Sequence, residues 1–478
     1  MIEPIYALLL TPLLAVAILA AVSNYRVGAA INMVASGLSC CAGVALLFVE
    51  RVRGDLLIID DFNIYLVILT TFVGFTTSIF SASYIGHELE TGRLTPVFLR
   101  FYHALYQTMM GAMTLALVAN NVGLLWVGLE LATLSTVVMV GLYRTPAAVE
   151  AAWKYFILGS VGIALAFFGT ILVYLVAQDV LGQGLAAMRW DALVREAAKF
   201  DPQLLSLAFV FLLVGYGTKV GLAPFHAWLP DAHSEGPTPI SAVLSGLLLN
   251  VGLYALLRFK MVLAANPAAL DVGKIMIGLG LISVVFAALM LYRRRDIKRL
   301  FAYSSIEHMG IITFAFGIGG PLANFAGLLH MTMHSLTKSA IFFVVGHIAQ
   351  VKGTQRLDDI RGLSTTHPTL AVGLAIGVFA IAGMPPSGVF MSEFLLISSS
   401  FPHAPLLTAI LVIGVLLAFG ALVLRLQGVL FGTPSGERGA VRATYIPLFI
   451  HLAIVIIAGL WLPEPVIKWF RIVAAQLG

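Results

Sequence analysis

Long runs of apolar residues, separated by short polar stretches, dominate this chain. About fourteen of them approach or exceed the roughly 20 residues with which an α-helix crosses a bilayer. The expected spans are Pro4–Val22, Val27–Val49, Phe62–Ile85, Phe101–Ala119, Gly123–Tyr143, Trp153–Ala177, Leu204–Ala223 with a short half near Trp228, Pro239–Phe259, Val272–Tyr292, Leu300–Ile318, Ala323–Gln350, Leu370–Ser399, Pro405–Val429 and Tyr445–Leu462. A less apolar linker, Gln178–Pro202, is expected at the surface.

Composition supports this interpretation. Of the 478 residues, 60% are hydrophobic and only 11% are charged, whereas soluble domains carry roughly 25% charged residues. The mean hydropathy is +0.99. The sequence therefore predicts an all-α polytopic membrane protein.

Two of the expected spans are interrupted by proline. Pro224 breaks the seventh, and Pro385 with Pro386 breaks the twelfth. Proline removes a backbone donor and clashes with the preceding helical turn, and broken helices persist in hydrocarbon only where protein or a wet cavity surrounds them. Because the breaks lie five spans apart, they predict two five-helix repeats of opposite topology.

This reading divides the chain into four segments. Residues 1–100 form a three-span segment, 101–260 the first repeat, 261–430 the second repeat, and 431–478 the last span with a short tail.

Loop charges favour one orientation. With the N-terminus outside, the cytoplasmic loops hold more Lys and Arg than the outer ones. The strongest basic block, Arg293–Arg299, then lies inside, where it anchors the topology or, alternatively, binds anionic lipid. The net charge of +5 fits loop anchoring and does not point to nucleic acid.

Several kinds of chemistry find no support in the sequence. The only cysteines, Cys40 and Cys41, are adjacent in an apolar run and suit packing, so we expect no iron–sulfur or zinc site. No Gly-rich phosphate loop follows a strand pattern, and the residues after Met1 do not resemble a cleaved signal peptide. We expect no bound cofactor or metal.

Four charged residues inside or near spans are candidate functional groups: Glu130, Lys154, Lys219 and Glu393. A central charge costs roughly 2.5–3.5 kcal/mol on insertion scales, so it marks an ion path more often than packing. Structural ion pairs remain the alternative for both glutamates, and Lys154 is near enough to a span end to reach the interface. A pair such as Glu130–Lys219 that opens and closes could release a proton.

Histidines add a second group. Three residues recur at intervals of four on the eleventh span and form one polar stripe: His330, His334 and Lys338. Imidazole can pass protons near neutral pH, although hydrogen bonding between helices would also explain the stripe. His347 lies on another face and stays unassigned. Glu307 and His308 are either site residues or contacts at a span end.

Four stretches resemble the antiporter-like membrane subunits of respiratory complex I and of group 4 membrane-bound [NiFe]-hydrogenases: KVGLAPFHAWLPDAHSEGPTP, YSSIEHMG, HMTMHSLTKSAIFF and AGMPPSGVFMSEF. The stretch ELATLSTVVMVGLYRTPAAVEAAWKYFILG is most similar to the hydrogenase-4 component F branch, of formate hydrogenlyase type. The resemblance extends over nearly the whole chain and implies fourteen spans with inverted repeats.

The resemblance also implies roles for matching residues. Glu130, Lys154 and Lys219 fall on family positions of the proton path, as do Glu393 and the polar stripe of the eleventh span. Asn250 departs, because the most similar complex I subunits have a lysine there. An amide can hold a water wire but cannot store charge.

The leading hypothesis is therefore a proton-translocating membrane subunit of a redox-driven complex. It has no redox site of its own, lies in the inner membrane of a prokaryote, and works with other membrane subunits and a soluble redox arm. The alternatives are a subunit of a multi-subunit Na⁺/H⁺ antiporter and a non-pumping structural subunit. A free-standing solute carrier has less support.

Overall fold

The computed structural model is built almost entirely of helices, and it describes residues 3–99, 101–435, 439–440 and 444–478. The helices are α1 (Pro4–Ala21), α2 (Tyr25–Ala45), α3 (Asp61–Glu90), α4 (Pro96–Leu99), α5 (Tyr102–Val118), α6 (Val122–Val140), α7 (Pro146–Leu181), α8 (Trp190–Glu196), α9 (Pro202–Val220), α10 (Leu229–Glu235), α11 (Thr238–Val243), α12 (Leu249–Ala264), α13 (Val272–Leu291), α14 (Ile297–Ile318), α15 (Gly320–Lys352), α16 (Leu363–Thr366), α17 (Pro368–Ile381), α18 (Gly388–Ser400), α19 (Pro405–Phe431), α20 (Ile446–Leu460) and α21 (Glu464–Gln476). The predicted all-helical, multi-pass class is confirmed. Met1, the predicted boundary at Arg100, and part of the predicted last segment lie outside the described residues.

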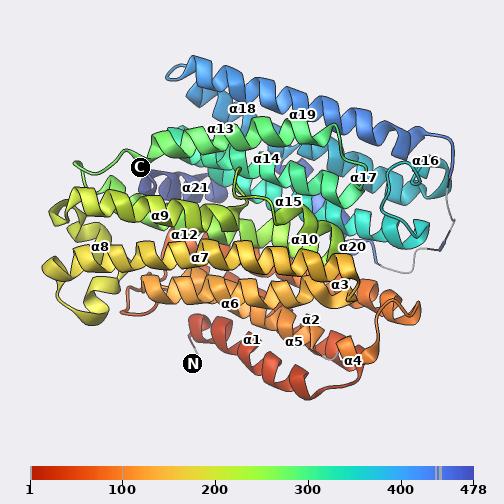
Figure 1. The fold of residues 1–478 in the computed structure, drawn as a ribbon, viewed down its shortest axis with the longest axis horizontal. Helices are drawn as coiled ribbons and strands as arrows, with labels where there is room; N and C mark the ends of the chain where they lie inside the picture. The colour runs from red at the N-terminus through yellow and green to blue at the C-terminus, as the bar shows by residue number, and fades with distance from the viewer. Residues whose placement is uncertain (1–2, 100, 436–438, 441–443) are drawn as a thin grey trace.

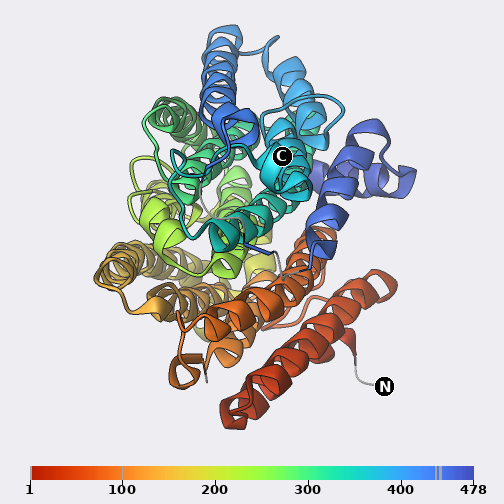
Figure 2. The same ribbon diagram turned by 90° about the vertical axis from the view of Figure 1, so that its right-hand side faces the viewer.

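Most of the long helices run side by side along the longest axis of the molecule (Figure 1). They follow chain order from α1 and α2 at one edge to α18 and α19 at the other, and the view along the bundle shows the same progression (Figure 2). The last two helices return to the middle and pack on α3 and α15. Neighbours in sequence are thus neighbours in space, as short connections favour.

Ten helices in the described part of the chain are long and apolar enough to cross a membrane, and the number reaches eleven if α20 and α21, bent by 82°, form one span. The sequence predicted about fourteen. The difference comes partly from interrupted or shorter helices: α17 and α18 are apolar but have only 14 and 13 residues, and α5 has 17. Helix α14 has 22 residues but is too polar to be among the ten.

The first interruption lies where Pro224 predicted it. Helix α9 ends at Gly221, whose φ of 77° is a left-handed conformation that glycine adopts without strain. The groups released by the break find partners: the Ala223 N–H donates to Ser283 Oγ at 2.9 Å, and the Trp228 indole N–H donates to the Thr218 carbonyl at 2.8 Å. Such pairing lets a broken helix persist at membrane depth.

The second interruption lies between α17 and α18. Gly383 has a φ of 66°, and the Pro385-Pro386 bond is cis, as is Ala223-Pro224 at the first break. The Ser387 side chain accepts a hydrogen bond from the Phe390 N–H at 3.2 Å and so caps the new helix. Both predicted interruptions are therefore real features of the backbone.

Helix α15 forms the core. It has 33 residues, corresponding to about 50 Å at 1.5 Å per residue, and nearly all of its central positions are buried. It packs against α3, α11, α14, α17, α18, α20 and α21. A helix enclosed on every side can carry polar groups without exposing them to lipid.

The linker predicted at the surface is partly buried instead. It contains α8, where Trp190 and Leu193 are buried. The Trp190 indole N–H donates to the Arg258 carbonyl at 2.8 Å, and the Arg258 guanidinium lies 4.1 Å from the centre of the indole ring. The same guanidinium pairs with Asp60 at 2.7 Å. The linker thus covers a buried arginine that apolar neighbours alone could not accommodate.

Candidate functional site

Glu130 on α6 and Lys219 on α9 form an ion pair inside the bundle. Their nearest charged atoms lie 3.7 Å apart, and only 1% of the Lys219 side chain is exposed. That separation is too long for a direct hydrogen bond, so the lysine donates instead to Thr133 Oγ1 at 2.9 Å. The predicted pairing of these two residues is present in the structure, with a hydroxyl beside it.

Two glycines shape the space around Lys219. A methyl group on Gly159 of α7 would lie 3.1 Å from the lysine Nζ, and one on Gly252 of α12 would lie 3.1 Å from its Cβ. Both distances are tighter than ordinary contacts, so larger residues would displace the lysine. Helices α7, α9 and α12 therefore approach closely because these positions lack side chains.

Lys154 lies apart from that pair. Its ammonium contacts Glu150 at 2.6 Å and Asp231 at 3.2 Å, and about half of the side chain is exposed. Asp231 also binds Arg299 at 2.9 Å. The structure thus places Lys154 in an ion-pair network at the edge of the bundle, in keeping with the alternative that it reaches the interface.

Asn250 connects the two halves of the chain. It follows a π-helical segment, Leu244–Leu248, which the sequence did not suggest and which often marks functional positions. Its amide N–H donates to Ser335 Oγ on α15 at 2.6 Å and to the Gly246 carbonyl at 3.1 Å. The amide therefore joins α12 to α15 at the residue after His334 of the polar stripe.

The second group is a chain of buried histidines. His308 Nδ1 on α14 lies 2.9 Å from His330 Nε2 on α15, and His330 Nδ1 lies 2.9 Å from Ser392 Oγ on α18. The His334 ring is 5.6 Å from the His308 ring, centre to centre. Glu393 follows Ser392 in the chain, and one of its carboxylate oxygens lies within 4.8 Å of a ring nitrogen of His308 and of His330. Three helices thus meet at one polar cluster.

Lys338 and Glu307 extend this cluster. The Lys338 ammonium is fully buried and donates to the Phe301 carbonyl at 3.0 Å. Glu307 is buried on α14 and interacts electrostatically with Glu393 and Lys338. A carboxylate near a buried lysine repeats the combination of Glu130 and Lys219 in the first half of the chain.

Three residues lie deeper in the bundle than the sequence predicted. Glu307 and His308 are buried within α14 and do not lie at its end. Lys298, within the basic block predicted as a loop anchor, is buried and donates to the Ser234 and Gly236 carbonyls at 3.2 and 2.5 Å. The motif YSSIEHMG, whose polar residues interrupt an apolar run, was the available signal for the first two.

Several buried polar atoms along this line have no hydrogen-bond partner among the described residues. They are Glu130 Oε2, Asn250 Oδ1, Glu307 Oε2, His308 Nε2 and both ring nitrogens of His334. An unpaired buried polar group costs roughly 1–3 kcal/mol. Buried residues away from this line, such as His103 and His233, also have ring nitrogens without a hydrogen-bond partner among the described residues.

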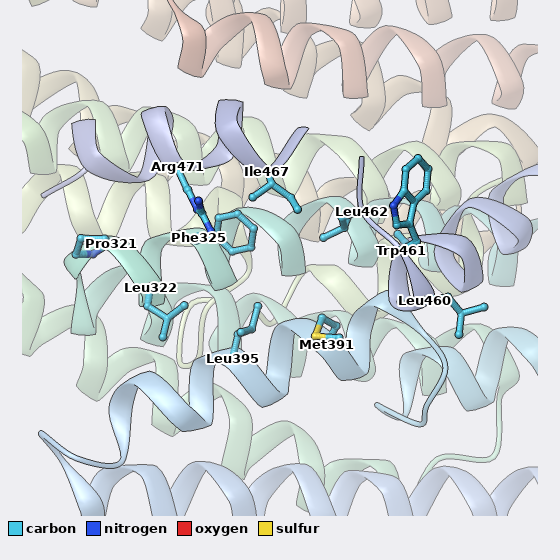
Figure 3. Close-up of a pocket in the computed structure, with 12 residues that line it drawn as sticks. Pro321, Leu322, Phe325, Met391, Leu395, Leu460, Trp461, Leu462, Ile467 and Arg471 are labelled. Atoms are coloured by element: carbon cyan, nitrogen blue, oxygen red, sulfur yellow. The ribbon is translucent and has the colours of Figure 1, made fainter. Parts of the chain in front are cut away.

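A separate cavity of about 560 Å³ lies beside the second break (Figure 3). Its walls come from the start of α15, from α18, and from the bend between α20 and α21; Phe325, Met391 and Trp461 are among them. The lining is mainly apolar, with Arg471 as its cation. The line of titratable residues does not enter it, so the candidate site is the polar line and not this cavity.

Buried acids, lysines and histidines across a bundle with two broken helices define the class of antiporter-like membrane subunits. The comparisons agree. Residues 119–418 match the family described as "NADH:quinone oxidoreductase/Mrp antiporter, TM", and the chain belongs to this family.

Individual relatives narrow the resemblance. The chain is 57% identical over 465 residues to the hydrogenase-4 component F homolog of Methylacidiphilum infernorum, covering 97% of this chain and 98% of the relative. It is 30% identical over 390 residues to NADH-quinone oxidoreductase subunit N of Deinococcus radiodurans, covering 79% and 75%. It is thus an antiporter-like membrane subunit of the complex I and hydrogenase-4 type, similar to proteins of prokaryotes.

Two solved structures share the fold. A chain of the archaeal membrane-bound sulfane sulfur reductase superposes with a TM-score of 0.89 at 22% identity, covering 99% of this chain and 98% of the other. A chain of the Mrp complex from Dietzia sp. DQ12-45-1b gives 0.86 at 18% identity, covering 100% and 98%. Both belong to multi-subunit membrane complexes.

Proposed function

We propose that this chain moves protons across the membrane as one subunit of a redox-driven complex of hydrogenase or complex I type. The observation that carries the proposal is the series of largely buried polar groups, most of them titratable, from Glu130 and Lys219 through Asn250 to the histidine cluster and Glu393. Hydrogen bonds or ion pairs at 2.6–3.7 Å join different helices at three places along it: Lys219 with Glu130 and Thr133, Asn250 with Ser335, and His330 with His308 and Ser392. The 57% identity to a hydrogenase-4 component F homolog supports the hydrogenase type.

The finer architecture is part of the same proposal. We assign fourteen spans by counting α11 and α12, joined through the π-helical segment, as one helix, and α9 with α10 and α17 with α18 as single interrupted spans. Residues 101–260 and 261–430 are then inverted repeats, each with one broken helix. The N-terminus lies outside, in the inner membrane of a prokaryote.

The energy for transport comes from partner subunits. Moving one charge against 100 mV costs about 2.3 kcal/mol, and the described residues include no cluster suited to electron transfer. A soluble redox arm and further membrane subunits would supply the driving force by separating Glu130 from Lys219. Lys154, at the edge of the bundle, would exchange protons with the aqueous phase.

Replacing Lys219 by alanine tests the proposal. We expect the purified, assembled complex to lose proton transport in proteoliposomes while its redox turnover is impaired or uncoupled. Lys274 is a matched control, because it is an exposed lysine whose one ion pair within the described part of the chain is with Asp271 at 3.5 Å. An unchanged proton-to-electron ratio in Lys219→Ala would refute the assignment and favour a structural subunit.

The same vesicles show whether the transported ion is H⁺ or Na⁺. Transport that continues without Na⁺ and collapses with a protonophore supports proton movement. Transport that requires Na⁺ would instead favour a sodium/proton antiporter subunit.

A further inference from the structure

We propose that His308, His330 and Glu393 form a binding site for a divalent transition-metal ion, with Zn²⁺ as the best-fitting ion. One ring nitrogen from each histidine and a carboxylate oxygen lie within 4.8 Å of one another, and all three residues are buried. They come from α14, α15 and α18, so the fold and not local spacing brings them together. The sequence led us to expect no metal, because no short Cys/His motif is present.

The distances suit a tetrahedral ion. Zinc binds histidine nitrogen at about 2.0–2.1 Å, so two such ligands on one ion are separated by roughly 3.3 Å. His308 Nδ1 and His330 Nε2 are 2.9 Å apart. A small outward rotation of the two rings would admit the ion in place of the hydrogen bond between them. Glu393 supplies the third ligand, and a fourth position remains for water, as in sites with three protein ligands.

Ser392 completes the arrangement. Metal-binding histidines usually donate their second ring N–H to an oxygen, which fixes the tautomer and the ring orientation. The Ser392 hydroxyl donates to the Val389 carbonyl, so Ser392 Oγ accepts from the N–H at His330 Nδ1, 2.9 Å away; Nε2 of the neutral ring then carries no proton and faces His308. The hydroxyl itself contacts the Val389 carbonyl at 2.7 Å and is thereby held in place.

The ligand set determines which ions fit. Two imidazoles and one carboxylate favour Zn²⁺ or similar transition metals over Mg²⁺ and Ca²⁺, which prefer oxygen. The positive charge of Lys338 acts on His308 and opposes a cation, whereas Glu307 interacts with Glu393 and favours one. Such a balance suits reversible binding from solution better than a permanent structural ion.

Binding would have a consequence under the proposed function. An ion between His308 and His330 replaces the contact through which a proton would pass, so Zn²⁺ would inhibit transport. This consequence rests on the proposed function, but binding itself does not. Direct binding measurements can therefore fail or succeed independently of transport.

The test uses the purified complex that contains this chain. Zn²⁺ binding is measured by equilibrium dialysis with elemental analysis, and Co²⁺ is used as a spectroscopic probe of tetrahedral coordination. We expect one high-affinity ion per chain in the wild type and its loss in His330→Gln. Ser392→Ala keeps all three ligands and should bind the ion about 10–100-fold more weakly, the usual effect of removing such a partner.

His347→Gln is the matched control. His347 is also a buried histidine of α15, but it lies 17 positions from His330, or about 25 Å along the helix. It should bind Zn²⁺ and Co²⁺ as the wild type does. Equal affinity in the wild type, His330→Gln and Ser392→Ala would overturn the site. Binding that follows this pattern without slowing transport would support the site and count against the proton path.

Discussion

Replacing Glu130 by glutamine should reduce the membrane potential against which this chain can move protons. Glutamine has nearly the same shape but no charge. The substitution therefore keeps the packing of α6 and removes only the attraction for the Lys219 ammonium at 3.7 Å. Lys219 would keep its hydrogen bond to Thr133.

The size of the effect follows from the geometry. At 3.7 Å, with an effective dielectric constant of about 20, the attraction is about 4.5 kcal/mol. Moving one charge across the membrane costs about 2.3 kcal/mol per 100 mV. The attraction between Glu130 and Lys219 is therefore equivalent to a membrane potential of roughly 200 mV. Desolvation of both ions reduces this figure, so about 200 mV is the upper bound on the loss.

Proteoliposomes containing the assembled complex provide the assay. The membrane potential is clamped with potassium gradients and valinomycin, and proton uptake is followed with a pH-sensitive dye during redox turnover. Glu130→Gln should stop pumping at a lower potential than the wild type, while Glu464→Gln, which removes an exposed carboxylate near Lys468, should not. Equal pumping by wild type and Glu130→Gln at every potential would refute the role of this pair.

Two further predictions concern stability. Gly383→Ala should lower the stability of the fold by about 1–2 kcal/mol, because a non-glycine residue is strained at φ 66° and its methyl group would overlap the Glu393 carboxylate. As a control, Gly278→Ala, with open space around it, should not lower the melting temperature of the complex. Burial raises the pKa of Asp191, but the Arg189 hydrogen bond and further donors outweigh this and hold it below its usual value. The resulting stabilisation of the folded state is present above the unfolded pKa of about 3.9 and is lost as the pH falls through the lower folded pKa. Between pH 5 and pH 3 the wild type should therefore lose more thermal stability than Asp191→Asn. Equal losses would contradict a contribution of this ion pair to stability.

The sequence predicted the helical class and both interruptions because each has a local cause. Apolar runs of sufficient length specify helices at membrane depth, and Pro224 and Pro385 cannot continue one. Charges inside those runs, such as Lys219, are costly enough to be informative without a structure. These signals all act within a few residues.

Contacts between distant helices could not be predicted in this way. Spacing placed His330 and His334 on one face of α15, but it could not bring His308 of α14 or Ser392 of α18 to that face. For the same reason Lys298 was mistaken for a loop anchor. Its carbonyl partners come from the segment around α10, more than 60 residues earlier.

The positions of the two breaks relative to the titratable groups indicate where movement would matter. Lys219 lies two residues before Gly221, where α9 ends, and Glu393 lies in the second turn of α18 after the break at Pro386. Glu130, which pairs with Lys219, and His330, which lies near Glu393, are both within unbroken helices. A small rotation at either break would therefore separate a mobile charged group from a fixed one without disturbing α15. Under the proposed function, an outside force acting at the breaks would alter the proton affinity of both sites while the central helix stays in place.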